Sequence, residues 1–499
     1  MAPLDKHLKK VTRLDEASRT ASQAIAAPGL AGIFLLAVVI FAATWTASGP
    51  LSFYVISAAL VGGYMAIYVG ANDVANNVGP AVGGRALTLV GALVIAAIFE
   101  AAGALIAGGD VVKTISKNII RPEPEMEVLA FILIMMAGIL AAAMWVHLAT
   151  HIGAPVSTTH SVVGGVLGSG IAASGFGIVS WPTMSAIAAS WVISPVLGGV
   201  FAACLYWLVR KAILTRSAPF DAARRWLPPL VAAMSGVFAM YLALKGLKHV
   251  WKPSWSMLLV IGAAFFIVTL LISRPLIRYQ SRQSEAQGKQ VTSLFVLPLI
   301  AAAALLCFAH GANDVANAVG PLAAIVAAAG AGVAAPSSVP LPLWVLLIGA
   351  IGISTGLALF GPTVIRTVGE KITKMNPSRA YCVALAAAIT VLIASTLGLP
   401  VSSTHITVGG VFGIGLFREA ISNRGLAKSS VQPQTGISNV STLNATSEEA
   451  VRRTSKRERR KLVRRQYGLA IGGAWIITVP ATAIISGLLY KVMAYSAGV

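Results

Sequence analysis

Long apolar stretches, almost free of charged residues, run along most of the chain. A helix that spans a membrane needs about 20 consecutive, mainly apolar residues. The sequence predicts such helices at 28–48, 51–69, 86–107, 127–148, 182–208, 227–246, 255–273, 293–310, 341–361, 380–398 and 467–491. Only 11% of the residues are charged and 57% are hydrophobic, whereas a soluble domain has about 25% charged residues. The composition therefore excludes a soluble enzyme and a disordered chain, and it indicates an all-α polytopic membrane protein.

Three further apolar segments are either too rich in Gly, Ser and Thr or too short to be predicted as ordinary membrane-spanning helices. The segments 153–175 and 399–417 are predicted to be re-entrant hairpins, and 321–335 is predicted to be a half-span. With these segments, we expect about twelve transmembrane elements.

The basic residues predict the orientation of the chain. The formal net charge is +21, and Lys and Arg gather in segments 1–24, 209–226, 274–292 and 418–466. The positive-inside rule places all four, and so the N-terminus, in the cytoplasm. The segment 172–180 has no Lys or Arg and is expected outside. The loop 245–254 carries three lysines yet must also lie outside, which is the weak point of this orientation.

The same charge pattern favours the lipid bilayer over nucleic acid as the partner of this basic chain, because the charges lie in short runs between apolar segments. The run 452–465 could bind anionic lipid, although an orientation signal is the simpler interpretation. The N-terminal segment does not have the form of a signal peptide, so we expect the first apolar helix to stay in the mature protein. Cys204, Cys307 and Cys382 are isolated in apolar runs, which predicts neither a disulfide framework nor a metal site.

Two pairs of nearly identical segments divide the chain into halves. GANDVANNVGP begins at Gly70 and GANDVANAVGP at Gly311, and ten of their eleven positions match. PVSTTHSVVGGV (155–166) is followed in the second half by PVSSTHITVGGV (400–411), and a fainter pair begins at Gly103 and Gly356. Ordered blocks that recur in both halves indicate an internally duplicated body of the transporter type.

The orientation signals predict that the two copies are inverted. The helix that enters the first GAND block starts outside, whereas the helix that enters the second starts inside. We therefore divide the chain into a cytoplasmic segment (1–24), a first helix (25–50), repeat 1 (51–208), a linker with two helices (209–292), repeat 2 (293–491, with the basic loop 418–466) and a tail (492–499). Inverted repeats place a substrate site between the halves, near the middle of the bilayer.

The GAND blocks place carboxylates deep in apolar segments. A charged side chain at that depth costs about 2.5–3.5 kcal/mol or more, so Asp73 and Asp314 indicate function. Gly and Pro on both sides predict broken helices with free backbone groups, which would suit a hard monovalent cation or a proton. The alternative is hydrogen bonding between helices by asparagine. The candidate polar side chains beside the two acids are Asn72, Asn76, Asn77, Asn313 and Asn317.

The second pair of blocks offers consecutive hydroxyl groups. Pro155 and Pro400 pre-set the start of a helix, and a helix N-terminus attracts anions through its free N–H groups and its dipole. N-capping explains one hydroxyl in each copy, but not three. The candidate anion ligands are Ser157, Thr158, Thr159, Ser402, Ser403 and Thr404.

Several other polar residues are candidates for a gate or a proton relay. His160 and His405 end the hydroxyl blocks, where a packed structural histidine is an equally good interpretation. His310 precedes only the second GAND block, because Val69 takes its place in the first. Glu100 lies in an otherwise apolar span, and its counterpart in repeat 2, near Ile353, is apolar.

The fainter repeat adds a pair of basic residues. Lys113 aligns with Arg366, and the two either neutralise an anion at a gate or mark helix ends. His147 and His151 are four residues apart on one helical face, but without Cys or carboxylate neighbours they do not predict a metal site.

Together, the two motifs make the chain resemble the inorganic phosphate transporter family, over most of its length outside 1–24, 209–292 and 418–466. The resemblance implies symport of phosphate with protons or sodium, with a neutral metal–phosphate complex as a further substrate form in bacterial members. It also implies inverted repeats, a homodimer and no cofactor. The short basic loop 418–466 resembles the bacterial branch, which implies the bacterial cytoplasmic membrane.

Carried over to this sequence, the resemblance implies a phosphate site formed by Asp73, Asn76, Asp314, Asn317 and the six hydroxyl residues, with Asn72, Asp73, Asn313 and Asp314 beside the coupling ion. The charges supply a physical reason for coupling, because a phosphate dianion next to two aspartates needs cations or protons to enter with it. A symporter of another oxyanion such as sulfate, a passive channel and a membrane hydrolase remain alternatives. The hydrolase is the weakest, since no nucleophile elbow is present.

Overall fold

The computed structural model describes residues 25–154, 156–246, 253–334, 336, 339, 341–365, 375–429 and 465–499. The predictions for the N-terminal segment, Pro155, Arg366 and most of the basic loop 418–466 therefore lie outside the described residues. Within the described ranges the chain is helical throughout, apart from one isolated β-bridge between Ile120 and Val179.

Two similar series of helices flank a helical pair. After the first helix (Ile25–Trp45), the first series is α2 (Ser52–Gly83), α3 (Leu89–Ala107), α4 (Gly109–Lys113), the π-helical turn η1 (Thr114–Asn118), α5 (Val128–Ile152), α6 (Thr158–Ser174) and α7 (Trp181–Val209). The linker pair is α8 (Pro219–Gly246) and α9 (Trp255–Ala286). The second series is α10 (Val296–Ala331), α11 (Leu343–Leu359), α13 (Pro377–Thr396), α14 (Ser403–Ser429) and α16 (Arg465–Ala497).

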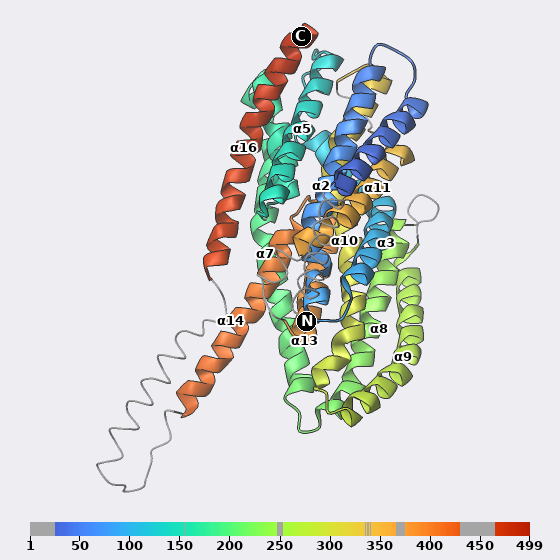
Figure 1. Cartoon of the computed structure of the whole chain (residues 1–499), viewed down its shortest axis with the longest axis vertical. Helices are drawn as coiled ribbons and strands as arrows, with labels where there is room; N and C mark the ends of the chain where they lie inside the picture. The colour runs from blue at the N-terminus through green and yellow to red at the C-terminus, as the bar shows by residue number, and fades with distance from the viewer. Residues whose placement is uncertain are drawn as a thin grey trace, which may run out of the picture.

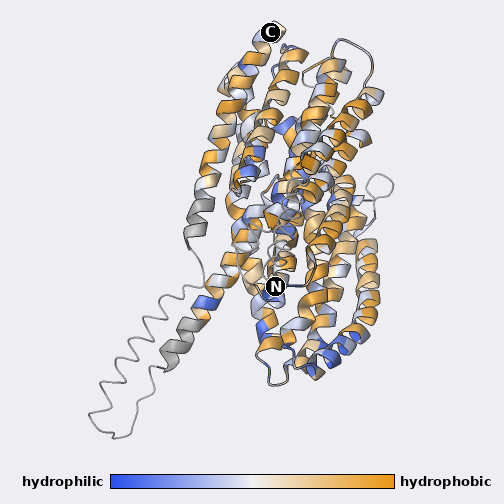
Figure 2. Ribbon diagram, in the orientation of Figure 1, coloured by the Kyte–Doolittle hydropathy of each residue, from blue (hydrophilic) through white to orange (hydrophobic). Residues whose placement is uncertain are grey.

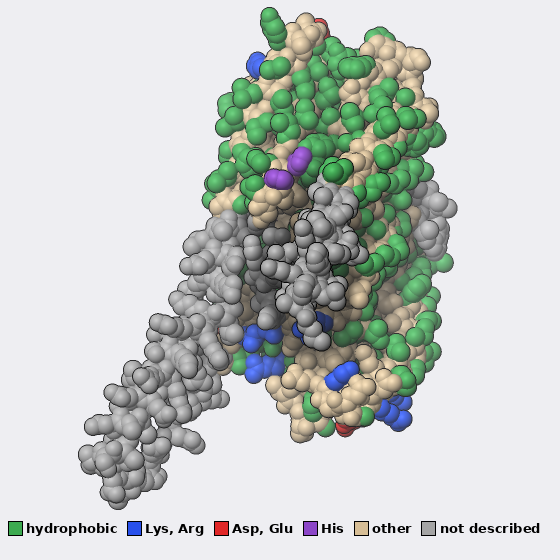
Figure 3. Space-filling view, in the orientation of Figure 1, with side chains coloured by type: hydrophobic (Ala, Val, Ile, Leu, Met, Phe, Trp, Pro, Cys, Tyr) green, Lys and Arg blue, Asp and Glu red, His purple; other side chains and the backbone are tan. Residues whose placement is uncertain are grey.

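The described helices confirm the prediction of a polytopic membrane protein. Ten of them are long and apolar enough to cross a membrane, and α11 is a shorter apolar helix. Hydrophobic side chains spread over much of the face drawn in Figure 3, and the ribbon in Figure 2 is largely in the hydrophobic colours. Many apolar side chains are exposed, such as Ile33 at 65% and Val268 at 54%. A soluble protein does not carry apolar surface on this scale, so lipid is the surrounding medium.

The two series are inverted and interlocked. In Figure 1, α5 and α6 lie toward the end where the C-terminus is marked, whereas α13 and α14 lie toward the opposite end. The helix α2 packs against α11 and α3 packs against α10. The last helix of each series crosses over to the other half, because α7 packs along α14 and α16 packs along α6. This arrangement confirms the predicted fold class, while the residue boundaries assigned to the repeats stay a prediction.

Matching glycines mark the contacts between the halves. A Cβ atom on Gly70 would lie 2.0 Å from the backbone oxygen of Ile353, and one on Gly311 would lie 2.0 Å from that of Glu100. Glu100 and Ile353 are themselves matching positions of the two repeats. The first glycine of each GAND block therefore contacts the same position of the opposite repeat. Small residues let helix backbones come this close in membrane proteins.

These contacts correct the prediction that the GAND blocks are unwound. The helix α2 continues through 70–80 to Gly83, and α10 continues through 311–321 to Ala331, so the predicted half-span 321–335 is mostly the end of α10. The glycines allow close packing and do not break the helix. The helices use most backbone groups of the motif, but Pro80 and Pro321 lack the N–H groups that would bond to the carbonyl oxygens of Asn76 and Asn317. The side chains of the motif are therefore the main groups that can hold a ligand.

The breaks in the membrane helices lie instead at the hairpin tips. The helix α5 ends at Gly153 and α13 is followed by Gly398, and both glycines have φ of +68°, a left-handed conformation that favours glycine. Ser157 then caps α6 by accepting a hydrogen bond from the backbone N–H of His160. Each of the two segments predicted to be re-entrant, 153–175 and 399–417, is one helix, α6 or the first part of α14, that turns back along the helix before it, α5 or α13.

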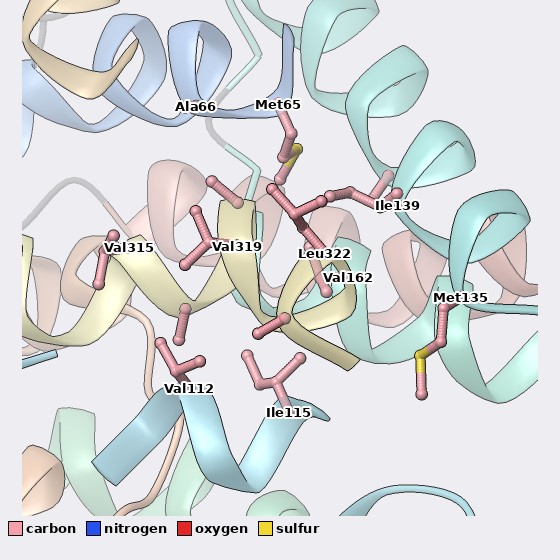
Figure 4. Close-up of a cluster of buried hydrophobic side chains, with 14 of the residues drawn as sticks. Met65, Ala66, Val112, Ile115, Met135, Ile139, Val162, Val315, Val319 and Leu322 are labelled. Atoms are coloured by element: carbon pink, nitrogen blue, oxygen red, sulfur yellow. The ribbon is translucent and has the colours of Figure 1, made fainter. Parts of the chain in front are cut away.

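The core lies where α10 passes through the molecule. Val315, Val319 and Leu322 on α10 meet Met65 of α2 and Ile115 of η1 (Figure 4), and all five side chains are fully buried. This packing fixes α10 against α2, which positions the polar residues of the two GAND blocks.

The close approach of the helices makes a testable prediction about stability. We expect Gly311→Ala to lower the free energy of unfolding by about 3 kcal/mol, because the new methyl group would enter the backbone of α3. Gly79→Ala is the matched control, since a Cβ atom there meets nothing within 4 Å. The midpoint of thermal unfolding in detergent measures both. Equal midpoints for Gly311→Ala and the wild type would contradict the packing described here.

Candidate functional site

Two buried aspartates from different halves share one hydroxyl group. Asp73 on α2 and Asp314 on α10 are each 1% exposed. Thr158, in the first turn of α6, has its Oγ1 3.0 Å from Oδ2 of Asp73 and 3.3 Å from Oδ2 of Asp314. The two carboxylates therefore face a common point, which brings together the motifs that lie 241 positions apart in the sequence.

The second hairpin reaches the same point. Thr404, in the first turn of α14, donates to Oδ1 of Asp73 at 3.1 Å and accepts from Nδ2 of Asn76 at 2.7 Å. On the other side, Asn317 donates to the hydroxyls of Thr158 and Thr159 at 3.2 and 3.1 Å. All of these side chains are buried, so they form one hydrogen-bonded network, which we call the central network.

The first asparagine of each block holds the hairpin of its own half. Asn72 donates to the carbonyl oxygen of Val156 at 3.1 Å, in addition to Oδ1 of Asp73. Asn313 donates to the carbonyl oxygen of Leu399 at 3.2 Å and accepts from the backbone N–H of Val401 at 3.2 Å. These side chains link the position of each hairpin tip to the helix that carries the adjacent aspartate.

A third carboxylate and a histidine extend the central network in one direction only. Nε2 of His310 lies 3.2 Å from Asp314 and 3.7 Å from Asp73, and its Nδ1 lies 3.3 Å from Oε2 of Glu100. Oε1 of Glu100 accepts from Nδ2 of Asn77 at 2.8 Å. His310, Glu100 and Asn77 are fully buried; we call them the buried triad. A fully buried carboxylate requires such partners.

A comparison of the two repeats could have revealed this triad from the sequence, because its three residues differ together between the copies. In the other copy, the positions of His310, Glu100 and Asn77 are taken by Val69, Ile353 and Ala318. All three polar residues are therefore replaced together by apolar ones. Sequence reasoning identified His310 and Glu100 separately and treated Asn77 only as an added polar group, so it missed that they are one unit.

The triad also borders a group of residues that could hold a metal ion. One ligand atom from each of Asp73, His310 and Asp314 lies within 4.8 Å of the others. The sequence predicted no metal site, since the isolated cysteines and the spacing of His147 and His151 gave no ligand pattern, and residues from the two halves could not be combined. Two carboxylates and an imidazole are a donor set suited to a divalent cation.

A cavity of about 140 Å³ leads to the central network from one side. Asn72, Asn76 and Thr404 line its inner part, and residues at the tip of the α5–α6 hairpin and after α11 line its outer part. His151 in that outer part is exposed, and histidine side chains reach the surface on the face shown in Figure 3. The site is thus accessible from the side of the Gly153 tip. The full lining is Asn72, Ala75, Asn76, Thr150, His151, Ile152, Gly153, Ala154, Thr363, Val364 and Thr404.

Some predicted site residues lie apart from this network. Ser157 caps α6, and its Oγ is 2.7 Å from Nδ1 of His160. The ring of His160 stacks on Trp191 and lies 4.8 Å from that of His405. These contacts support the structural interpretation of the two histidines. A Ser–His pair exists here, but neither residue lines the cavity described above.

Three more of the predicted site residues, Ser402, Ser403 and Lys113, also lie outside the central network. Ser402 caps α14 by accepting from the backbone N–H of His405 at 3.4 Å. Ser403 is buried and its hydroxyl has no hydrogen-bond partner among the described residues. Lys113 is exposed at the end of α4, and no contact joins it to the central network within the described part of the chain.

The comparison with known proteins agrees with the geometry. Residues 69–486 match the model of a family described as the phosphate transporter family. The chain belongs to that family. The match runs from the GAND block of the first half to α16, so this transporter-family chain carries both motif pairs inside the matched region.

Relatives match the transporter over most of their length. A protein from Helicobacter pylori, named as a phosphate permease, is 44% identical over 83% of this chain and 78% of its own. Another of that name, from Thermococcus kodakarensis, is 35% identical over 87% of this chain and 96% of its own. The solved structure of a protein named as a sodium-dependent phosphate transporter is 34% identical, has a TM-score of 0.74 and covers 89% of this chain and 99% of its own.

Proposed function

We propose that the protein is a secondary active symporter that imports inorganic phosphate together with protons by alternating access. The observation that carries the proposal is the convergence of Asp73, Asp314 and the hydroxyls of both hairpins on one point at the end of a cavity. Family membership and the names of the relatives support phosphate as the anion.

The hydroxyl and amide groups of the central network suit a tetrahedral oxyanion. Thr158, Thr159 and Thr404 offer hydroxyl groups, while Asn76 and Asn317 offer N–H donors. In the arrangement described, these donors satisfy one another and the aspartates. An entering phosphate would take over their hydrogen bonds, so no buried donor has to lose its partner during binding.

The carboxylates explain why phosphate needs a companion. Two unit charges 4 Å apart interact by about 4 kcal/mol at an effective dielectric constant of about 20. A phosphate dianion beside Asp73 and Asp314 meets several such repulsions, and Glu100 adds a third carboxylate nearby. Each proton or cation that enters with phosphate removes part of this repulsion, so binding of the two is coupled.

The buried triad supports protons as the coupling ion. His310 bridges Glu100 on one side and the two aspartates on the other, at distances of 3.2–3.7 Å. Imidazole can take up and release a proton at either nitrogen, so this arrangement offers a path between the third carboxylate and the central network. The related solved structure is named as sodium-dependent, which makes sodium the competing coupling ion.

The group formed by Asp73, His310 and Asp314 supports a second form of the substrate. A divalent cation that entered with phosphate could be held there by two carboxylates and an imidazole. Such a metal–phosphate complex would itself cancel part of the charge at the site.

The orientation that we propose places the N-terminus in the cytoplasm and the cavity on the cytoplasmic side. Arg210, Lys211, Arg216 and Arg224 surround the turn between α7 and α8, which the positive-inside rule assigns to the cytoplasm. The helix α5 then enters from outside, so its Gly153 tip points inward. A bacterial cytoplasmic membrane, a homodimer and the absence of enzymatic activity are further parts of the proposal.

Phosphate uptake into proteoliposomes tests the proposal. We expect an inward proton gradient to drive accumulation of labelled phosphate above its external concentration, and a protonophore to abolish it. Accumulation driven only by sodium would show that sodium is the coupling ion. Full competition by excess sulfate would indicate a different oxyanion substrate. Equilibration without accumulation under any gradient would indicate a channel, and hydrolysis of an ester without uptake would indicate an enzyme.

A further inference from the structure

On the side of the molecule opposite the cavity, an ion pair joins the linker to the first half of the chain. Near the end of α8, Nζ of Lys245 lies 2.7 Å from Oδ2 of Asp110 on α4 and donates to the carbonyl oxygen of Thr396 at 3.2 Å. The side chains of Lys245 and Asp110 are only 14% and 25% exposed. One ammonium group thus joins the linker, the first half and the α13–α14 hairpin.

The two hairpin tips are equivalent in sequence but differ in their surroundings. Gly153 and Gly398 occupy matching positions and have the same φ of +68°. Gly153 lines the cavity. At Gly398, by contrast, a Cβ atom would lie 3.3 Å from Oγ1 of Thr114 and 3.4 Å from the carbonyl oxygen of Asp110. One tip is therefore open and the other is packed against α4 and η1.

The packed tip is held from two sides. From the centre, Asn313 bonds to Ser395 and to the backbone of Leu399 and Val401. From outside, Lys245 bonds to Thr396. The site and the linker therefore hold the same segment, so opening of this tip requires both sets of contacts to change.

The linker helix is also anchored close to the buried triad. Tyr241, one turn before Lys245, and Phe238 both meet the ring of Phe308 edge-on, with ring centroids 6.2 and 5.0 Å apart. Phe308 precedes His310 by two residues on α10. A displacement of α10 at the triad would therefore also displace the part of α8 that carries Lys245, through these ring contacts.

We propose that Lys245 and Asp110 form a latch that holds the gate opposite the cavity closed, and that the linker pair α8–α9 controls this gate. The inference rests on the proposed alternating-access function. Since α8 and α9 belong to neither repeat, the Gly153 tip has no matching latch among the residues that the structure describes. The gates at the Gly153 and Gly398 tips therefore differ, because only the gate at Gly398 requires the Lys245–Asp110 contact to break before it opens. In the proposed orientation, the latched gate faces the outside.

Thiol labelling tests the latch without relying on transport. In a variant with Cys204, Cys307 and Cys382 replaced by serine, Thr114→Cys places a reporter under the packed tip. A membrane-impermeant maleimide is added to right-side-out and inside-out vesicles that contain the full-length protein. We expect Lys245→Met and Asp110→Asn each to raise the labelling rate by about tenfold, the change that follows when a closed state loses about 1.4 kcal/mol of preference. The increase should occur only from the side opposite the cavity.

Two further variants separate a latch from a general loss of structure. The charge exchange, Lys245→Asp with Asp110→Lys, should return labelling to the wild-type rate, and Lys289→Met, an exposed lysine just after α9, should not change it. Unchanged labelling in both single variants, or no recovery in the exchange, would overturn the latch. If the single variants do not fold, Lys245→Cys with Asp110→Cys replaces them. An oxidised pair that still allowed full phosphate uptake would equally overturn it.

The labelling result is separable from the proposed function. Intact proton-driven phosphate uptake with unchanged labelling would refute the latch alone. A rise in labelling together with no phosphate uptake by the wild type would leave the gate in place and refute the phosphate symport.

Discussion

Asp73→Asn and Asp314→Asn are each expected to lower coupled phosphate uptake by at least about 100-fold, while the protein still inserts in the membrane. Oδ1 and Oδ2 of Asp73 accept hydrogen bonds from Thr404 and Thr158, and Asp314 shares the single hydroxyl hydrogen of Thr158 with Asp73. A hydrogen bond to a charged group contributes about 1.5–3 kcal/mol, and a loss of about 2.7 kcal/mol corresponds to 100-fold. Initial rates of uptake into proteoliposomes under a proton gradient measure the effect.

The matched control for these variants is Asp221→Asn. Its carboxylate lies on α8, is 70% exposed and pairs with Arg224 on the surface, where such pairs contribute little. Uptake by this variant should equal that of the wild type. Full uptake by both Asp73→Asn and Asp314→Asn would refute the role of the central network as the coupling site.

His310→Val is expected to destabilise the protein by about 3–5 kcal/mol, the usual cost of removing one member of a buried pair, because it leaves Oε2 of Glu100 buried without its imidazole partner. The variant copies the residue at the matching position, Val69. The triple variant His310→Val, Glu100→Ile, Asn77→Ala copies all three apolar counterparts and should recover most of the lost stability. Thermal unfolding in detergent compares the single variant, the triple variant and the wild type.

The triple variant also separates stability from coupling. Since the buried triad is the proposed proton path, the folded triple variant should exchange phosphate across the membrane but should no longer accumulate it in response to a proton gradient. Accumulation at the wild-type level by this variant would exclude the triad from proton coupling. A triple variant as unstable as His310→Val would show that Glu100 is not the source of the instability.

The convergence of the site was predictable because each motif occurs twice. A carboxylate in the middle of an apolar helix has few acceptable surroundings, and two of them in inverted copies meet near the middle of the bilayer. The repeated motifs therefore predict one buried cluster of Asp73, Asp314, Thr158 and Thr404, and the hydrogen bonds between these side chains confirm the cluster.

Whether the backbone of the GAND blocks is helical or unwound could not be predicted from the repeats. Glycine, asparagine and proline in one segment are typical of a helix break, yet Gly70 and Gly311 serve close contacts with the backbone of α11 and α3. These two uses of glycine have the same sequence pattern. They differ only in what packs against the residue, and that is decided by a helix elsewhere in the chain.

The contacts of the linker were beyond sequence reasoning for another reason. Lys245 contradicted the orientation rule, because a lysine was not expected at the outer end of a span. Its partner Asp110 lies in the first half, and the linker has no second copy with which to compare it. A contact between a repeat and the linker occurs once in the chain, so the comparison of the two repeats cannot predict it.

The exchange of the last helices between the halves has a consequence for how the protein is made. The helix α6 packs along α16, which is synthesised only after the linker pair and the other helices of the second series. Throughout synthesis of the linker and most of the second half, the small-residue face of α6 around Gly164 and Gly168 has no partner from its own chain. The packing of the first hairpin is therefore completed only once α16 has been made.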